Sequence, residues 1–137
     1  MNGLAKQARG AMETALILIG NEARNHFVDS FKKQGFEDKA VQKWTPRKKQ
    51  DKRAGRAILV KSGDLRRSII RGSISKSALS VKIKTDLKYA EVHNFGLRAG
   101  RGNGFMMPKR QFIGDSYNLN EKVKKIVVNK LDSLFKK

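Results

Sequence analysis

Apolar residues recur in steps of three and four through the first quarter of the chain, and this spacing constrains the fold more than any other feature. Such steps place side chains on one face of an α-helix. We predict a long helix that ends at Gly35 as its C-cap. Gly10 and Gly20 each weaken a helix by about 1 kcal/mol relative to alanine, so we expect bending or fraying there. The apolar stripe consists of Leu4, Ala8, Met12, Ala15, Leu16, Ile19, Ala23, Phe27 and Phe31.

Period-two alternation appears in the middle of the chain. Residues 68–75 and 79–85 flank a short polar connection and predict a β-hairpin with one buried face. Before this hairpin, Ser62 is expected to cap a brief helical turn that carries Leu65 and Ile69. The apolar side of the hairpin consists of Ile70, Gly72, Ile74, Leu79, Val81 and Ile83.

The last third of the chain predicts a strand between two helices. We expect a short helix or turn over residues 86–96, then a flexible basic loop over 97–103. Pro108 restricts the following apolar segment to an edge strand or the start of one. A final helix is expected to start at Asp115 or Ser116, with an apolar stripe formed by Leu119, Val123, Ile126, Val127, Leu131 and Leu134.

These elements predict an α+β fold. A long N-terminal helix and a C-terminal helix pack on a small, mostly antiparallel β-sheet, with a long basic loop between the first helix and the sheet. At 137 residues, we expect a single domain over 1–137. Its parts are the N-terminal helix (1–35), the basic loop (36–57), a β-rich core with short helices (58–114) and the C-terminal helix (115–137).

The counts of cysteine and histidine exclude several kinds of chemistry. The absence of cysteine excludes disulfides, thiolate catalysis and cysteine-based metal sites, and two histidines are too few for a three-histidine metal site. We therefore expect no cofactor and no metal. The longest uncharged apolar run, residues 15–20, is far shorter than the roughly 20 residues that span a bilayer. No secretory signal is visible, so we expect a soluble, cytosolic protein with no membrane partner.

No catalytic constellation stands out, so we expect that the protein is not an enzyme. Glu91 and His93 would converge only on an extended segment, and a structural histidine near a turn is the favoured interpretation. A small basic ribonuclease that uses His26, His93 and arginines is the enzymatic alternative. The glycine-containing segment 96–104 lacks the context of a Walker or Rossmann phosphate loop.

Positive charge is concentrated in two segments that we expect to contact partners. The formal net charge is +19, from 31 Lys and Arg against 12 Asp and Glu. Contact with a nucleic-acid backbone, contact with an acidic protein, and a surface kept soluble by charge all remain open. Trp44 and Pro46 interrupt the first segment, and we expect Trp44 to anchor it to the core. The cations are Lys43, Arg47, Lys48, Lys49, Lys52, Arg53, Arg56, Arg98 and Arg101.

Four short motifs follow one another between Trp44 and Ser116. The first is Trp44-x-Pro46. The second is Ile-Leu-Val-x-Ser-Gly-x-Leu-x-x-Ser-Ile at residues 58–69, and the third is Tyr-Ala-x-Val-His-x-x-Gly at 89–96. The fourth is Met-Pro-x-Arg-x-Phe-Ile-Gly at 107–114. In this order, with a hairpin between the second and third, they resemble the phage virion-morphogenesis, or tail-completion, family over more than half of the chain.

The resemblance implies a structural protein of the phage neck or tail end that acts when head and tail are completed or joined. It implies no reaction. The motif residues are then fold determinants: Leu65 and Ile69 fill the core, Ser62 and Gly63 set the turn into the short helix, Tyr89 and His93 pack beside Gly96, and Pro108, Arg110 and Phe112 shape and anchor the last strand.

We also expect the protein to assemble. Basic loops extended from a small domain allow a ring subunit to clasp its neighbours. The resemblance implies a homo-oligomeric ring, a hexamer, in contact with other phage neck or tail proteins. Contacts are expected through residues 47–56 and 97–103, and some cations would face phage DNA if the ring surrounds the channel. The expected location is the virion, after synthesis in the bacterial host cytoplasm; a sequence-independent nucleic-acid-binding protein is the alternative.

Overall fold

The long helix α1 extends from Gly3 to Lys33 in the computed structural model, which describes residues 3–136. The helix is continuous through Gly10 and Gly20, so the expected fraying at these glycines is wrong. Gly20 is buried, and a Cβ at this position would lie 2.6 Å from Arg71 Cδ and 3.0 Å from Val81 Cγ2. The glycine therefore lets the hairpin that carries these two residues approach the helix closely.

The C-terminus of α1 differs from the prediction. Gln34, not Gly35, adopts the left-handed conformation, with φ 54°. Its amide Nε2 donates to the carbonyl oxygens of Phe31 and Ile58 at 2.7 and 3.1 Å, and its Oε1 accepts the Ile58 N–H. These hydrogen bonds stabilise a conformation that side chains rarely adopt. Gly35 instead begins a strand, where a Cβ would collide with the Gln42 backbone.

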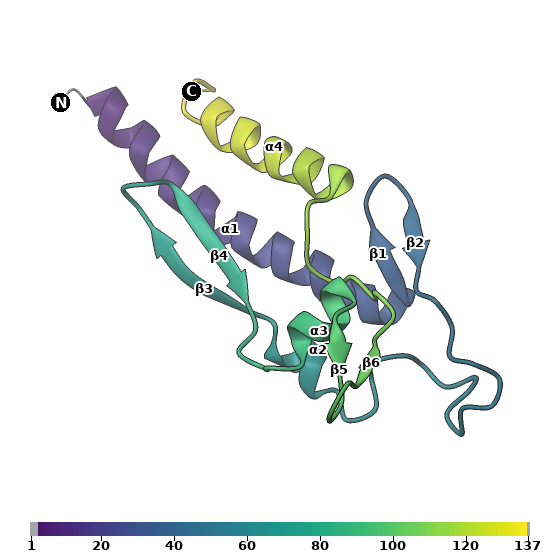
Figure 1. Ribbon diagram of the computed structural model, residues 1–137. Helices are drawn as coiled ribbons and strands as arrows, with labels where there is room; N and C mark the ends of the chain where they lie inside the picture. Colours follow the sequence, from purple (N-terminus) through teal and green to yellow (C-terminus); the bar gives the residue numbers. More distant parts are fainter. Residues whose placement is uncertain (1–2, 137) are drawn as a thin grey trace.

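Within residues 3–136, six short strands form three separate antiparallel hairpins (Figure 1). The α+β class and the antiparallel pairing are confirmed, but the strands do not join into one sheet. The pairs are β1 (Gly35–Glu37) with β2 (Val41–Lys43), β3 (Ile70–Ser75) with β4 (Ser80–Lys84), and β5 (Arg98–Ala99) with β6 (Phe105–Met106).

The β3–β4 pair is the hairpin that the alternation predicts, with one correction. Its register shifts between Arg71 and Ile74. Such an irregularity offsets the alternation of faces. Ile70 is consequently 43% exposed, whereas Ile74, Val81 and Ile83 are half-buried. The hairpin lies against α1, as Figure 1 shows.

Two segments predicted as loops contain strands. β1 and β2 occupy the start of the expected loop 36–57, and β5–β6 encloses residues 97–103. Strands of two or three residues are too short to show a recognisable alternation. Gly100, Gly102 and Gly104 have positive φ angles and form the turn of the β5–β6 hairpin. A Cβ at Gly104 would collide with the carbonyl of Ala99.

The predicted last strand is shorter than expected. β6 ends at Met106, so Pro108, Arg110 and Phe112 do not belong to a strand. The N–H groups of Arg110 and Phe112 donate instead to the His93 carbonyl and the Asn94 side chain, at 2.8 Å each. A helix therefore supplies the hydrogen bonds that a neighbouring strand would have supplied.

Three further helices complete the fold: α2 (Asp64–Ser68), α3 (Ala90–Phe95) and α4 (Tyr117–Asp132). Gly63, with φ 76°, is the N-cap of α2, and the hydroxyl of Ser62 accepts the Asp64 N–H at 3.3 Å, so the predicted cap is displaced by one residue. Ser116, one of the two predicted starting residues, is the N-cap of α4, because its Oγ accepts the Leu119 N–H. α4 lies along α1 (Figure 1).

The core forms around the C-terminal half of α1. Phe31 is 2% exposed, and its ring centroid lies 5.6 Å from that of Trp44 and 5.4 Å from that of Phe112. Trp44 Nε1 donates to the Gln111 carbonyl at 2.8 Å, which confirms that Trp44 anchors its segment to the core. The buried cluster consists of Ala23, Phe27, Phe31, Phe36, Trp44, Ile58, Leu65, Ile69, Ala90, Phe112 and Leu119.

A polar junction joins the start of α4 to β1. The Ser116 hydroxyl donates to the Glu37 carbonyl at 2.6 Å and lies 3.0 Å from His26 Nε2. The Glu37 carboxylate accepts from Lys33 Nζ at 2.6 Å and from Asn118 Nδ2 at 2.9 Å. These two hydrogen bonds lower the pKa of Glu37 from 4.5 to about 2.

The low pKa of Glu37 predicts a pH-dependent stability. Because the folded-state pKa lies below the unfolded one, the carboxylate stabilises the fold above pH 4.5 and loses this contribution as the pH falls toward about 2. Glu37→Gln should lower the free energy of unfolding at neutral pH by about 1–3 kcal/mol and flatten its decline in acid. Urea denaturation over this pH range measures both effects.

The control is Glu121→Gln, which removes the exposed ion pair between Glu121 and Lys124 on α4. It should change the free energy of unfolding by less than about 1 kcal/mol. Equal losses from the two variants would contradict the role assigned to Glu37.

Candidate functional site

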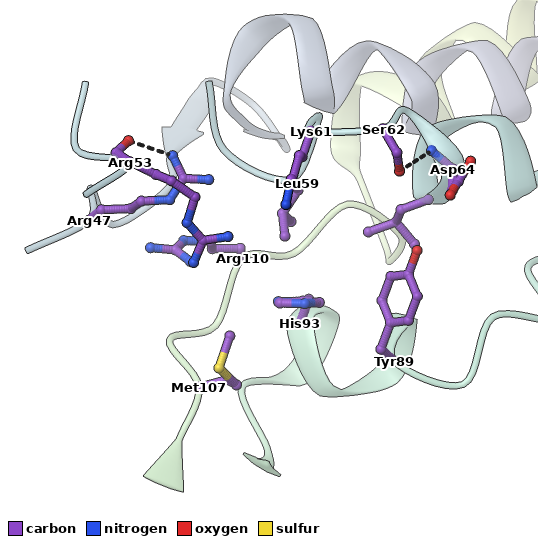
Figure 2. Close-up of a pocket in the computed structure, with 11 residues that line it drawn as sticks. Arg47, Arg53, Leu59, Lys61, Ser62, Asp64, Tyr89, His93, Met107 and Arg110 are labelled. Atoms are coloured by element: carbon purple, nitrogen blue, oxygen red, sulfur yellow. Dashed lines mark hydrogen bonds between the residues drawn. The ribbon is translucent and has the colours of Figure 1, made fainter. Parts of the chain in front are cut away.

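Two adjoining cavities form a cleft between the segment after β2 and the segment that contains β6. The inner cavity has a volume of about 200 Å³ and the outer one about 660 Å³. Arg47, Arg53, Met107 and Arg110 line both, so we name the whole the basic cleft. Figure 2 shows the inner cavity, with the three arginines on one side, His93 extending from α3 and Tyr89 from the N-cap of that helix. The inner wall also contains Leu59, Lys61, Ser62, Asp64 and Leu65, and the outer wall contains Thr45, Pro46, Lys48, Gln50, Asp51, Phe105, Met106 and Pro108.

Arg110 forms part of the wall shared by the two cavities. The residue is 6% exposed, and its Nε and Nη2 donate to the Thr45 carbonyl at 3.1 and 2.9 Å. Burial, and then the positive charge of Arg47, lower its pKa, while the Asp51 carboxylate opposes the change. The hydrogen bonds to Thr45 join the two sides of the cleft beside the core.

Arg47 gives the basic segment its shape. Its Nη1 donates to the carbonyls of Arg53 and Arg56 at 3.1 and 2.8 Å, and its Nη2 donates to the Ala57 carbonyl at 3.4 Å. One guanidinium group thus closes a loop of about ten residues on itself. The Asp51 carboxylate, which accepts the Arg53 N–H at 2.8 Å, supports the turn.

His93 lies on α3 at the inner cavity. Its ring packs edge-to-face against Tyr89, with centroids 6.1 Å apart. Burial, and then the positive charge of Arg110, lower its pKa below 6.5. Nδ1 is buried and makes no hydrogen bond within the described part of the chain.

The side chains that could serve acid–base catalysis do not assemble into a catalytic group. Glu91 and His93 lie on a helix, where residues two apart point to different faces. His26 and Ser116 do form a serine–histidine pair, but they are 5% and 0% exposed, and the serine caps α4. In residues 3–136 we find no group of three potential metal ligands and no helix long and apolar enough to span a membrane.

The predicted contact cations come together only in part. Arg47, Arg53 and Lys48 line the basic cleft, and Arg56 lines a smaller cavity beside it. The others lie outside the cleft: Lys49 and Lys52 are exposed on the same loop, Lys43 donates to the Lys33 carbonyl at the end of α1, Arg98 donates to the Asn103 carbonyl within its hairpin, and Arg101 is exposed at the β5–β6 turn.

Most of the motif residues lie on or near this cleft. Pro46, Ser62, Leu65, Tyr89, His93, Pro108 and Arg110 line it. Gly96 ends α3 in the left-handed conformation, and a Cβ there would lie 2.9 Å from the Lys109 backbone nitrogen. The glycine therefore lets the segment after β6 pass close to α3.

Asn94 is a site-positioning residue that the sequence analysis did not identify. It is 5% exposed, and its Oδ1 accepts the N–H groups of Phe112 and Ile113 at 2.8 and 3.0 Å. Its Nδ2 donates to the Ile113 carbonyl at 3.1 Å. The segment that carries Arg110 is thus held by one side chain of α3, and no local sequence pattern indicates this partner 18 residues away.

The fold and the cleft define a small α+β protein with a cleft lined by cations. Comparison with family models adds the identity: the chain belongs to the phage virion morphogenesis family, whose model matches residues 4–132. It is therefore a bacteriophage virion morphogenesis protein, as the motifs predicted. Comparisons with curated proteins and with solved structures gave no match.

Removal of the Asn94 side chain should destabilise the cleft wall. Asn94→Ala leaves the N–H groups of Phe112 and Ile113 without their acceptor and leaves the Ile113 carbonyl with only the 3.3 Å hydrogen bond from Gln111 Nε2. We expect a loss of about 2–4 kcal/mol in the free energy of unfolding. Thermal and urea denaturation measure the loss. Asn120→Ala, which removes an exposed amide that donates to Asp115 Oδ1, should cost less, and equal losses would contradict the positioning role of Asn94.

The environment of His93 predicts its titration. In an NMR titration, the His93 ring resonances should shift with a midpoint below pH 6.5. Because the unfolded state binds the proton more readily, the protein should lose stability as the pH falls through 6.5, and His93→Gln should remove this part of the loss. A midpoint at or above 6.5 would contradict the burial of the ring beside Arg110.

Proposed function

We propose that this protein completes the phage tail or joins head and tail, and that it assembles as a homo-oligomeric ring, a hexamer, at the neck or tail end. Membership of the phage virion morphogenesis family supports a role in building the particle. The role is structural rather than catalytic, because the groups suited to acid–base chemistry do not converge. The single observation that supports assembly into a ring is the amount of surface that the chain exposes.

The exposed surface is larger than the mass requires. The chain exposes 9540 Å². A compact monomer of 15.4 kDa exposes about 7,200 Å², which leaves an excess of about 2,300 Å². A ring subunit contacts two neighbours and buries about 800 Å² against each at a standard interface. The excess is therefore sufficient for both contacts of a ring.

Exposed apolar side chains support contacts through the predicted loops. Phe95, Phe105 and Met106 are each nearly 60% exposed, and Leu97 is 39% exposed. They lie at the end of α3 and on or beside the β5–β6 hairpin, whose second strand borders the basic cleft. Clustered exposed apolar side chains are typical of interaction surfaces. Contacts through residues 97–103 would bury Leu97 and the neighbouring Phe95, which do not line the basic cleft.

Sequence-independent nucleic-acid binding is the second candidate, and the net charge of +19 supports it. Within a ring, the same charge would face DNA in the channel. A free nucleic-acid-binding protein that neutralises about six phosphates would lose affinity about 10³-fold between 50 and 200 mM salt, without any assembly partner. Filter binding over this salt range separates a DNA-binding protein from an assembly subunit.

Charge reversal on the basic loop tests the assembly role. Replacement of Lys48, Lys49, Lys52 and Arg53 by Glu should abolish infectious particles while the fold is retained, because these side chains are exposed and outside the core. Complementation of a phage that lacks the protein, with circular dichroism of the variant, measures both.

The matched control reverses the same number of charges elsewhere. Lys6, Lys82, Lys124 and Lys125 are exposed and lie away from both loops. Their replacement by Glu should leave the titre near that of the wild type. Normal titres from the loop variant, or equal losses from both variants, would reject the loop as the assembly surface.

A further inference from the structure

The basic cleft carries more positive charge than its own carboxylates neutralise. Five cations line it (Arg47, Lys48, Arg53, Lys61 and Arg110) against the carboxylates of Asp51 and Asp64. Asp64 is bound by Arg67 Nη2 at 2.8 Å, outside the cleft. Arg110 uses Nε and Nη2 for Thr45, so its Nη1 makes no hydrogen bond in the described structure. The inner cavity therefore presents a charged donor without an acceptor.

The outer cavity is apolar on one side. Phe105 and Met106 are each 58% exposed, and Met107, Pro46 and Pro108 extend this surface. The outer cavity, of about 660 Å³, has the size of a ligand pocket, and the adjoining inner cavity, of about 200 Å³, leaves room for a side chain. The bases of a DNA duplex are paired and stacked inside the helix, so its phosphate backbone gains nothing from an apolar wall. A polypeptide in which acidic and apolar side chains alternate matches both parts of the cleft.

A second copy of this chain is a poor donor of the acidic groups. Most Asp and Glu side chains of this chain form an ion pair or accept a hydrogen bond. Within residues 3–136 the exceptions are Asp29, Glu91 and Asp132, which lie on three different helices. Within residues 3–136 no stretch therefore carries neighbouring unpaired carboxylates that could fill the cleft of a second copy.

We propose that the basic cleft binds an acidic, apolar segment of a different virion protein. A carboxylate of that segment lies in the inner cavity against Arg53 and Arg110, and an apolar side chain lies in the outer cavity against Phe105 and Met106. This inference rests on the proposed function in one respect, namely that the virion contains a second protein for the cleft to bind. The cleft itself can be tested on the isolated full-length protein.

The test uses a short fluorescein-labelled peptide of alternating Glu and Leu, measured by fluorescence anisotropy. We expect saturable binding that weakens at least about tenfold in Arg53→Met, the loss typical of a charge-assisted hydrogen bond. Arg66→Met is the matched control: it removes the same charge from an exposed position on α2, with no side-chain hydrogen bond, and should leave the affinity unchanged. Phe105→Ser should also weaken binding, and a peptide of alternating Glu and Ser should bind less tightly than the Glu–Leu peptide.

Four results would overturn the proposal. The first is no saturable binding of the Glu–Leu peptide. The second is equal weakening by Arg53→Met and Arg66→Met, which would mean that net charge alone attracts the peptide. The third is a DNA duplex that displaces the peptide and itself depends on Arg53, and the fourth is binding of the peptide by the monomer but not by the assembled oligomer, which would make a second copy the occupant.

The two proposals fail separately. Peptide binding by a protein that forms no ring and is not needed for infectious particles would reject the proposed function and retain the cleft assignment. A ring that supports infection but does not bind the peptide would reject the cleft assignment alone.

Discussion

The contact of Phe31 with Trp44 and Phe112 is the interaction on which the rest of the structure depends. The three rings come from α1, from the segment after β2 and from the segment after β6, and no strand pairing joins these parts. Burial of apolar surface, rather than a ladder of hydrogen bonds, therefore fixes their relative positions. Hydrogen bonds from Trp44 to Gln111 and from Arg110 to Thr45 fasten the same two segments. The basic cleft lies beside this contact, so the core that stabilises the fold also positions the cations.

The distribution of charge follows from the same architecture. The few carboxylates are used mainly within the chain, at places such as the Glu37 junction and the turn at Asp51. Within residues 3–136 most cations form no ion pair with a carboxylate, and several of these follow one another closely on residues 47–56. A surface of this kind attracts anions over several ångströms. The acidic residues of the chain thus neutralise only part of its positive charge, and the rest is available to anionic partners.

Sequence reasoning succeeded where a signal is local and repeated. The stripe of α1, the β3–β4 alternation, the Ser116 cap and the anchoring Trp44 each depend on a few neighbouring residues or on one strong preference. It failed where tertiary contacts decide: the left-handed Gln34 is stabilised by Ile58, and the segment after β6 by Asn94. The short strands carry too few residues for any pattern. For the basic cleft, the run of cations in the sequence indicated Arg47, Lys48 and Arg53, and the fourth motif indicated Arg110. That these residues line one cleft depends on tertiary packing, which no local spacing in the sequence indicates.

The separation of the three hairpins has a consequence for how such a protein can change over generations. In a continuous sheet, an insertion in one strand disturbs the register of its neighbours. Here each hairpin pairs only with itself, and each is joined independently to the rest of the chain. A hairpin can therefore lengthen, shorten or change its tip without breaking a hydrogen bond in the other two. The sequence of each hairpin can therefore diverge together with whatever that hairpin contacts, while α1 and the aromatic core stay constant.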